Sequence, residues 1–151
     1  MEFKNRKPTR IPGYNYSTCN YYFITICTHE KKCVFGKPGQ LNQWGCIARN
    51  HIKKIEENYP CVMAYPYIVM PNHIHMVLEL NESDHNPNIS MLIGLYKAGV
   101  TKEIRKLCPD AVVWQRSFHD HIIRNQRSYE KICNYVENND KKWEQDCFYS
   151  V

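Results

Sequence analysis

The chain has 151 residues, 43% of them hydrophobic, which is enough for one domain with a buried core. Its 20 lysines and arginines against 15 aspartates and glutamates give a net charge of +5, compatible with a polyanionic partner but no proof of one. The sequence shows no membrane-length apolar run, no apolar leader and no C-x-x-C pair among its eight cysteines, so we expect a reduced, cytoplasmic protein without a membrane association.

The chain begins with a basic segment that has neither helical nor strand periodicity. Residues 1–19 are rich in Pro, Gly and Tyr and include Arg6, Lys7 and Arg10. We interpret this segment as an N-terminal arm that lies on the domain or on its ligand. Residues 20–151 then form a single domain.

Hydrophobic periodicity divides the domain into strands and helices. In chain order it predicts a strand at 21–28, a turn near 36–39, a helix at 43–58, strands at 61–69 and 73–80, a polar loop at 81–88, a helix from Ser90 to about Leu107, a short strand at 111–116 and a helix from Gln126 to about Trp143. Pro66 limits ladder hydrogen bonding, which favours an edge or bulged strand at 61–69. Apart from the last helix, this order predicts an α+β, ferredoxin-like split βαβ fold: an antiparallel sheet with both helices on one face.

Two histidines flank one apolar residue at the start of the strand at 73–80. Because strand side chains alternate between faces, His73 and His75 point to the same side, while Ile74 points to the other. Two imidazoles on one face of a rigid strand make a good platform for a divalent metal. The alternative is a pair of ordinary core or surface histidines, and the histidines alone do not decide between the two.

The last helix carries a tyrosine outside its apolar stripe. The stripe consists of Tyr129, Ile132, Cys133 and Val136. Tyr135 lies on the polar flank, with Asn139 one helical turn further on. If this helix packs across the sheet face that carries the histidines, the Asn139 carbonyl oxygen completes a site for Mg²⁺ or Mn²⁺, and Tyr135 becomes a nucleophile for a phosphate. The alternative is a surface tyrosine without a function.

Short segments spread over essentially the whole chain resemble the single-tyrosine HUH transposases. The closer resemblance is to the REP-associated tyrosine transposases, relatives of the insertion-sequence enzymes that move single-stranded DNA. The matching segments are R-K-P-T-R-I-P-G-Y-N-Y-S, Y-F-I-T-I-C-T, P-N-H-I-H, W-Q-R-S-F-H-D-H-I-I-R-N and Y-V-E-N-N.

The resemblance implies the ferredoxin-like fold and a set of catalytic roles. His73 and His75 are then the metal ligands, and Asn139 is the third ligand. Tyr135 attacks a DNA phosphate, which gives a 5′-phosphotyrosine link and a free 3′-hydroxyl. One departure matters: relatives usually read Y-I-x-x-N-P, whereas this chain has Asn139-Asp140 without a proline. The missing proline lets the helix continue toward Trp143 and makes Asp140 a competitor for the ligand position.

The resemblance also implies single-stranded DNA with hairpins as the partner. Candidates for phosphate contacts are Lys97 and Thr101 on the second helix, Arg116, His119 and Arg124 before the last helix, and Arg6, Lys7 and Arg10 in the arm. The loop triplet His119-Asp120-His121 offers a second-metal interpretation that we consider less favourable than phosphate contacts.

We therefore expect a metal-dependent transposase that cleaves and rejoins single-stranded DNA. A relaxase or replication-initiation nuclease has the same chemistry, but those proteins are usually larger. A catalytically inactive or domesticated nucleic-acid-binding module is the alternative from another class, and it would tolerate Tyr135→Phe. The sequence leaves open whether the protein is a monomer or a homodimer, and whether Tyr135 acts in cis or in trans.

Overall fold

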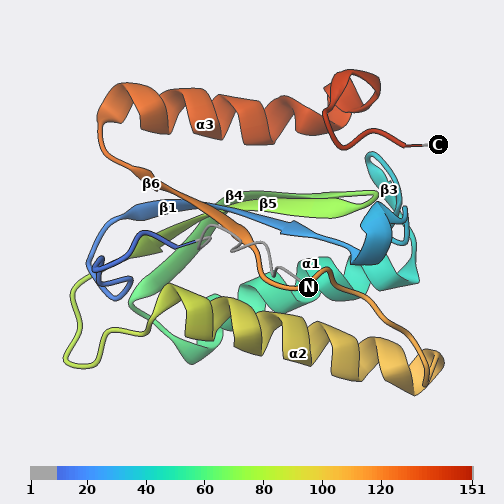
Figure 1. Cartoon of the computed structure of the whole chain (residues 1–151), viewed down its shortest axis with the longest axis horizontal. Helices are drawn as coiled ribbons and strands as arrows, with labels where there is room; N and C mark the ends of the chain where they lie inside the picture. Colours follow the sequence, from blue (N-terminus) through green and yellow to red (C-terminus); the bar gives the residue numbers. More distant parts are fainter. Residues whose placement is uncertain (1–9, 151) are drawn as a thin grey trace, which may run out of the picture.

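A four-stranded antiparallel sheet in the order β4-β5-β1-β6 forms the centre of the molecule, as seen in a computed structural model that describes residues 10–150 (Figure 1). The strands are β1 (Tyr21–Cys27), β4 (Val62–Met70), β5 (His73–Leu80) and β6 (His119–Ile123). Helices α1 (Gln43–Asn58) and α2 (Ile89–Leu107) cover one face, and α3 (Gln126–Asn138) lies on the other. This arrangement confirms the predicted α+β fold.

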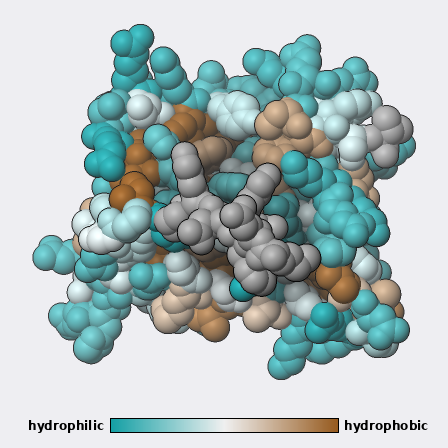
Figure 2. Space-filling view, viewed as in Figure 1, coloured by the Kyte–Doolittle hydropathy of each residue, from teal (hydrophilic) through white to brown (hydrophobic). Residues whose placement is uncertain are grey.

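Short elements complete the chain. The hairpin of β2 (Gly36–Lys37) and β3 (Gln40–Leu41) precedes α1, a 3-10 turn η1 (His29–Lys31) follows β1, and a 3-10 segment η2 (Asn139–Gln145) continues α3. Figure 2 shows hydrophilic side chains over the outer side of α3, hydrophobic ones between α3 and the sheet, and a mixture of both along α2. Within the described part of the chain, no helix is both long and apolar enough to cross a membrane.

The core lies between the sheet and the α1–α2 layer, and it fixes the register of the strands. Ile24 and Ile26 of β1 and Ile74 and Met76 of β5 are fully buried there. Burying each such side chain contributes about 2 kcal/mol. A slip by one residue would turn this apolar set to the other face, so the register is strongly specified. The side chains between them, including His73, His75 and Thr25, therefore face α3.

The prediction for Pro66 is confirmed. β4 is an edge strand of the sheet, and its pairing with β5 shifts between Ala64 and Tyr67. The Tyr65–Pro66 peptide bond is cis. At the outer edge of the strand, the Ala64 N–H donates to the Glu56 carboxylate at 2.7 Å instead of to a further strand.

The predicted strand at 111–116 is wrong. Within it only Trp114 forms a β-bridge, to Thr28, whereas Ala111 and Val113 are buried in the core without a ladder. The fourth strand is β6, which was predicted to be a loop. β6 is an edge strand with a solvent-facing side, so its exposed His119 and His121 hide the alternation that marks a strand.

Two helix ends also differ from the prediction. α2 starts at Ile89, because Asn88 caps it by accepting from the Ser90 N–H, so Ser90 lies inside the helix. The α-helical part of the last helix ends at Asn138, and the continuation toward Trp143 has the tighter 3-10 geometry of η2. Of the predicted apolar stripe on α3, only Val136 is fully buried.

Candidate metal and tyrosine site

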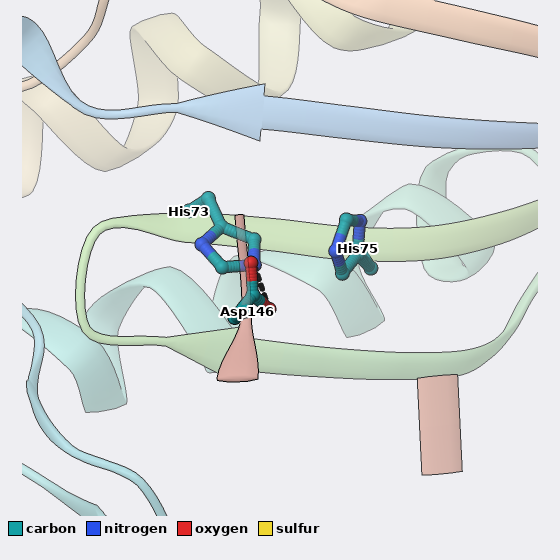
Figure 3. Close-up of side chains that lie close together, drawn as sticks. All are labelled: His73, His75 and Asp146. Atoms are coloured by element: carbon teal, nitrogen blue, oxygen red, sulfur yellow. Dashed lines mark ion pairs between the residues drawn. The ribbon is translucent and has the colours of Figure 1, made fainter. Parts of the chain in front are cut away.

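The two histidines of β5 lie beneath α3, on the sheet face away from α1 and α2. Figure 3 shows the rings of His73 and His75 side by side on the strand, with the Asp146 carboxylate against His73. The ring centroids are 4.6 Å apart, and both side chains are buried. One ligand atom each from His73, His75 and Asp146 lies within 4.8 Å of the other two.

The Nδ1 atom of each histidine is held by a neighbouring side chain. Thr25, the ladder partner of His75, places its Oγ1 2.9 Å from His75 Nδ1. The Asn72 Oδ1 lies 2.9 Å from His73 Nδ1. Hydrogen bonds of this kind to the second ring nitrogen orient histidines that bind metals.

The orientation of the Asn72 amide decides the tautomer of His73. The Asn72 Nδ2 donates to the carbonyl oxygens of Lys31, at 3.1 Å, and Phe148, at 2.7 Å. The Oδ1 must therefore face His73, whose Nδ1 must carry the proton that it donates. The Nε2 of neutral His73 is left with a free lone pair, which is the form that binds a metal.

Two further candidate ligand residues, Asn139 and Asp146, come from the segment after α3. Asn139 is 3% exposed, and its Nδ2 donates to Asp146 Oδ2 at 2.8 Å. The same Asp146 oxygen lies 3.6 Å from His73 Nε2, while Oδ1 accepts from the Phe148 N–H. The amide and the carboxylate thus hold each other beside the histidines.

Unsatisfied buried atoms converge at this point. Within residues 10–150, five buried side-chain polar atoms have no hydrogen-bond partner, and three of them are His73 Nε2, His75 Nε2 and Asn139 Oδ1. A buried acceptor without a partner costs about 1–3 kcal/mol. The Asn139 Oδ1 and the His73 Nε2 are acceptors, and the His75 Nε2 is one when Nδ1 donates its proton to the Thr25 hydroxyl. Atoms of this kind bind divalent cations, so these residues fit a metal ion.

The protonation states also suit a cation. Burial lowers the pKa of His73 to about 4 and that of His75 to about 3, where the neighbouring His73 lowers it further. Burial acts to raise the pKa of Asp146, but hydrogen bonds from Phe148 and Asn139 and the nearby histidines outweigh it and lower the pKa. At neutral pH the site thus holds two neutral imidazoles and one carboxylate.

Tyr135 lies beside the candidate metal site, which is formed by His73, His75 and Asp146, and it remains accessible. Its side chain is 45% exposed, and its ring centroid is 5.4 Å from that of His75 and 6.4 Å from that of Phe23. Burial and the Asp146 charge raise the pKa of its phenol, with Asn139 opposing. The phenol is protonated at neutral pH. The last helix packs across the histidine face, and this brings Tyr135, Asn139, His73 and His75 together.

Asp146 was not predicted from the sequence. Asp140, predicted as a competitor for the ligand position, is outside the candidate metal site and lines a separate cavity. The 3-10 turn of η2 and the extended residue at 146 lead the chain back to His73. No local pattern marks this return, because it depends on where the tail lies against β5.

Two cations predicted to contact DNA bind the protein itself. The Lys97 ammonium donates to the Gln115 and Ser117 carbonyls, both at 2.8 Å. The Arg10 guanidinium donates to Asp120 and lies over the Phe118 ring. Both cations hold the segment that enters β6, and whether they also contact phosphates stays a prediction.

The other predicted DNA contacts have varied positions. Arg116, His119 and Arg124 are exposed, and His119 pairs with Thr25, whose side chain lies on the sheet face of the candidate metal site. Thr101 is half-buried on α2, on the opposite side of the sheet (Figure 1). Arg6 and Lys7 lie outside the described residues.

The second-metal interpretation of His119-Asp120-His121 does not fit the fold. These residues form part of β6, so Asp120 faces away from both histidines, and its carboxylate binds Arg10.

Comparison with known proteins gives a family match. Residues 15–139 match the family model described as IS200-like transposase. An uncharacterized protein of Haemophilus influenzae strain Rd is 34% identical over 96% of this chain and 93% of its own length. A second protein of that strain, provisionally named a REP-associated tyrosine transposase, is 27% identical over 80% of this chain and 70% of its own length.

Solved structures share the fold. A REP-associated tyrosine transposase bound to a REP hairpin aligns with a TM-score of 0.62 over 94% of this chain and 74% of its own, at 19% identity. A Deinococcus radiodurans protein provisionally named a transposase aligns with a TM-score of 0.56 over 85% and 95%, at 16% identity. At these identities the likeness concerns the fold alone.

Stability of the metal-free protein should depend on the two histidines. Their pKa values are lower in the folded state than the ordinary 6.5, so the unfolded state binds more protons. The free energy of unfolding should therefore be highest above pH 6.5 and fall toward pH 4, by up to about 1.4 kcal/mol per pH unit for each titrating group. Urea denaturation in EDTA across this range measures the slope. If the His73→Gln, His75→Gln double variant showed the same slope of unfolding free energy against pH, the pH dependence would come from other groups.

Lys97→Met should destabilise the fold. The substitution keeps an apolar stem but removes two charge-assisted hydrogen bonds to backbone carbonyls, which should lower the free energy of unfolding by about 1–2 kcal/mol. Urea denaturation measures this, with the exposed Lys102→Met on the same helix as the matched control. Unchanged stability together with weaker DNA binding would instead make Lys97 a phosphate contact.

Proposed function

The chain belongs to the IS200-like transposase family, and from this premise we propose that it is a metal-dependent strand transferase that cleaves and rejoins single-stranded DNA through a covalent link to Tyr135. One observation carries the proposal. Three unpartnered buried ligand atoms, from His73, His75 and Asn139, converge directly beside an accessible tyrosine. A packing role explains neither the unpartnered atoms nor the exposed phenol.

The proposed metal ligands are His73, His75 and Asn139, with Asp146 as a fourth. Nitrogen, amide-oxygen and carboxylate donors suit Mn²⁺ or Mg²⁺. A divalent cation bound there would polarise a phosphate oxygen and favour attack on phosphorus. Thr25 and Asn72 act as positioning residues, because they orient the two imidazoles with Nε2 toward the site.

Tyr135 is the proposed nucleophile. Its exposed side admits a DNA phosphate from solvent, while its other side packs on His75. The phenol loses its proton as its oxygen bonds to phosphorus, and the bond from phosphorus to the 3′ oxygen breaks. The leaving 3′ oxygen takes up a proton, which gives a 5′-phosphotyrosine and a free 3′-hydroxyl. Because the phosphotyrosine conserves the energy of the broken phosphodiester, another 3′-hydroxyl can reverse the step and join new ends.

The proposed partner is DNA that combines a hairpin with a single-stranded stretch. A REP hairpin is bound to the similar REP-associated tyrosine transposase, which supports this class of partner. The exposed Arg116, His119 and Arg124 are the proposed phosphate contacts on the described surface. Their contribution makes binding dependent on salt.

A nucleic-acid-binding module without catalysis is the second candidate. The tail after η2 favours it, because the Phe148 ring lies 4.6 Å from that of His73, between centroids, and covers part of the ligand group. A permanent cover would leave binding intact and prevent cleavage.

A denaturation-resistant protein–DNA adduct should form on hairpin-bearing single-stranded DNA in the presence of Mn²⁺ or Mg²⁺. The oligonucleotides are taken from DNA that flanks the gene, and the adduct is detected by denaturing gel electrophoresis. Tyr135→Phe and His73→Ala should each lower its yield by at least about a thousandfold. Tyr129→Phe, on the same helix, is the matched control and should retain the adduct. An adduct that survives Tyr135→Phe would refute the assignment, and salt-sensitive binding without any adduct would support the second candidate.

Asn72→Ala should weaken metal binding without unfolding the protein. Loss of a partner that orients a ligating histidine typically costs about 10- to 100-fold in metal affinity. Isothermal titration with Mn²⁺ measures the affinity, and circular dichroism checks the fold. Asn72→Asp keeps an acceptor for His73 Nδ1 and should recover part of the loss, while the exposed Asn50→Ala should change nothing. Equal affinities for wild type and Asn72→Ala would show that Asn72 does not set the tautomer.

A further inference from the structure

A cavity of about 470 Å³ lies along the outer edge of β4, and its lining residue Ile68 pairs with His75 of the candidate metal site. Its walls come from the β2–β3 hairpin, α1, β4 and η2. The residues that matter below are Leu41, Arg49, Tyr67, Ile68 and Asp140. The metal and the tyrosine proposed above do not use any of them.

The cavity adjoins the reaction site along two paths. Ile68 is the ladder partner of His75, so it lies on the neighbouring strand, about 5 Å away between backbones, on the same face. Asp140 directly follows Asn139, the proposed third ligand. A DNA strand whose phosphate lies at His75 therefore has a neighbouring base within reach of this cavity.

The lining suits a flat ring with polar edges. Leu41, Tyr67 and Ile68 are half-buried and offer apolar and aromatic surface against which a base can pack. Polar groups from Arg49 and Asp140 occupy other parts of the wall. Sites that hold small molecules combine apolar walls with a few placed polar groups in the same way.

Asp140 indicates what the cavity selects. Its Oδ1 is buried and is among the atoms without a hydrogen-bond partner within residues 10–150. A carboxylate repels phosphate and accepts from N–H groups, and the exocyclic amino groups of cytosine, adenine and guanine are such donors. Thymine has no amino group. Arg49 is exposed at the cavity and is suited to bind an adjacent phosphate whatever the base.

We propose that this cavity is a base-reading pocket, in which Asp140 accepts a hydrogen bond from the amino group of a nucleobase next to the cleaved phosphate. The inference deepens the proposed function and rests on it. It makes Asp140 a specificity-determining residue and separates its role from that of Asp146.

The test measures binding separately from chemistry. The Tyr135→Phe protein is loaded with Mn²⁺ and mixed with a DNA hairpin that carries a randomised single-stranded flank, and the bound fraction is sequenced. At one flank position, amino-bearing bases should be enriched over thymine by about fivefold or more. Adding Asp140→Asn should reduce that enrichment to near unity, because an amide donates as well as accepts. The matched control is Glu144→Gln, which removes one exposed charge from the same 3-10 segment and should leave the enrichment unchanged.

Further variants keep the proposal falsifiable if Asp140→Asn fails to fold. Arg49→Ala should weaken binding of all flank sequences alike and lower its salt dependence. Tyr67→Ala should weaken binding of DNA several-fold, because the base at the selective flank position loses the aromatic ring against which it packs. A flank with no selective position, or an enrichment that survives Asp140→Asn or disappears in Glu144→Gln, would overturn the pocket. Enrichment without adduct formation by wild type would retain the pocket and overturn the strand-transfer proposal.

Discussion

The pairing of β1 with β5 places apolar side chains of both strands in the core, and the same pairing turns the intervening residues toward α3. Ile24 and Met76 face α1 and α2, so Thr25 and His75 must meet on the opposite side. The positions of the proposed ligands on β5 therefore follow from the burial of their neighbours. A polar pair at this depth is tolerated because Thr25 and Asn72 satisfy one nitrogen of each histidine.

Asn72 extends this constraint to parts of the chain that are distant in sequence. Its side chain contacts η1 through Lys31 and the tail through Phe148, while its backbone carbonyl accepts from the Thr28 N–H. One buried asparagine, through its side chain and its backbone, thus joins the end of β1, the start of β5 and the residues after η2. The tail held in this way includes Asp146, so the same contacts that orient His73 also bring a carboxylate to it.

The site residues differ in how well the sequence predicts them. Alternation along the strand predicts that His73 and His75 share a face, and spacing along the helix predicts that Tyr135 and Asn139 are neighbours. That the two pairs form one site is implied by the resemblance to the HUH transposases. Asp146 follows from neither, because its position depends on long-range contacts of an irregular tail. Lys97 and Arg10 look like DNA-binding cations in the sequence, yet nearby backbone carbonyls and Asp120 bind them. β6 was missed for a related reason: an edge strand exposes polar residues on one face, and its pattern then resembles a loop.

The charge of the site connects metal binding with DNA binding. Two neutral imidazoles and the Asp146 carboxylate give the ligand group a negative charge within a chain of net charge +5. A phosphate approaching that group alone is repelled, whereas a bound divalent cation reverses the local sign. Distant phosphates, in contrast, respond to exposed cations such as Arg116 and Arg124, which need no metal. On the proposed function, the hairpin can therefore bind before the metal does, while a phosphate at Tyr135 requires the metal to be in place.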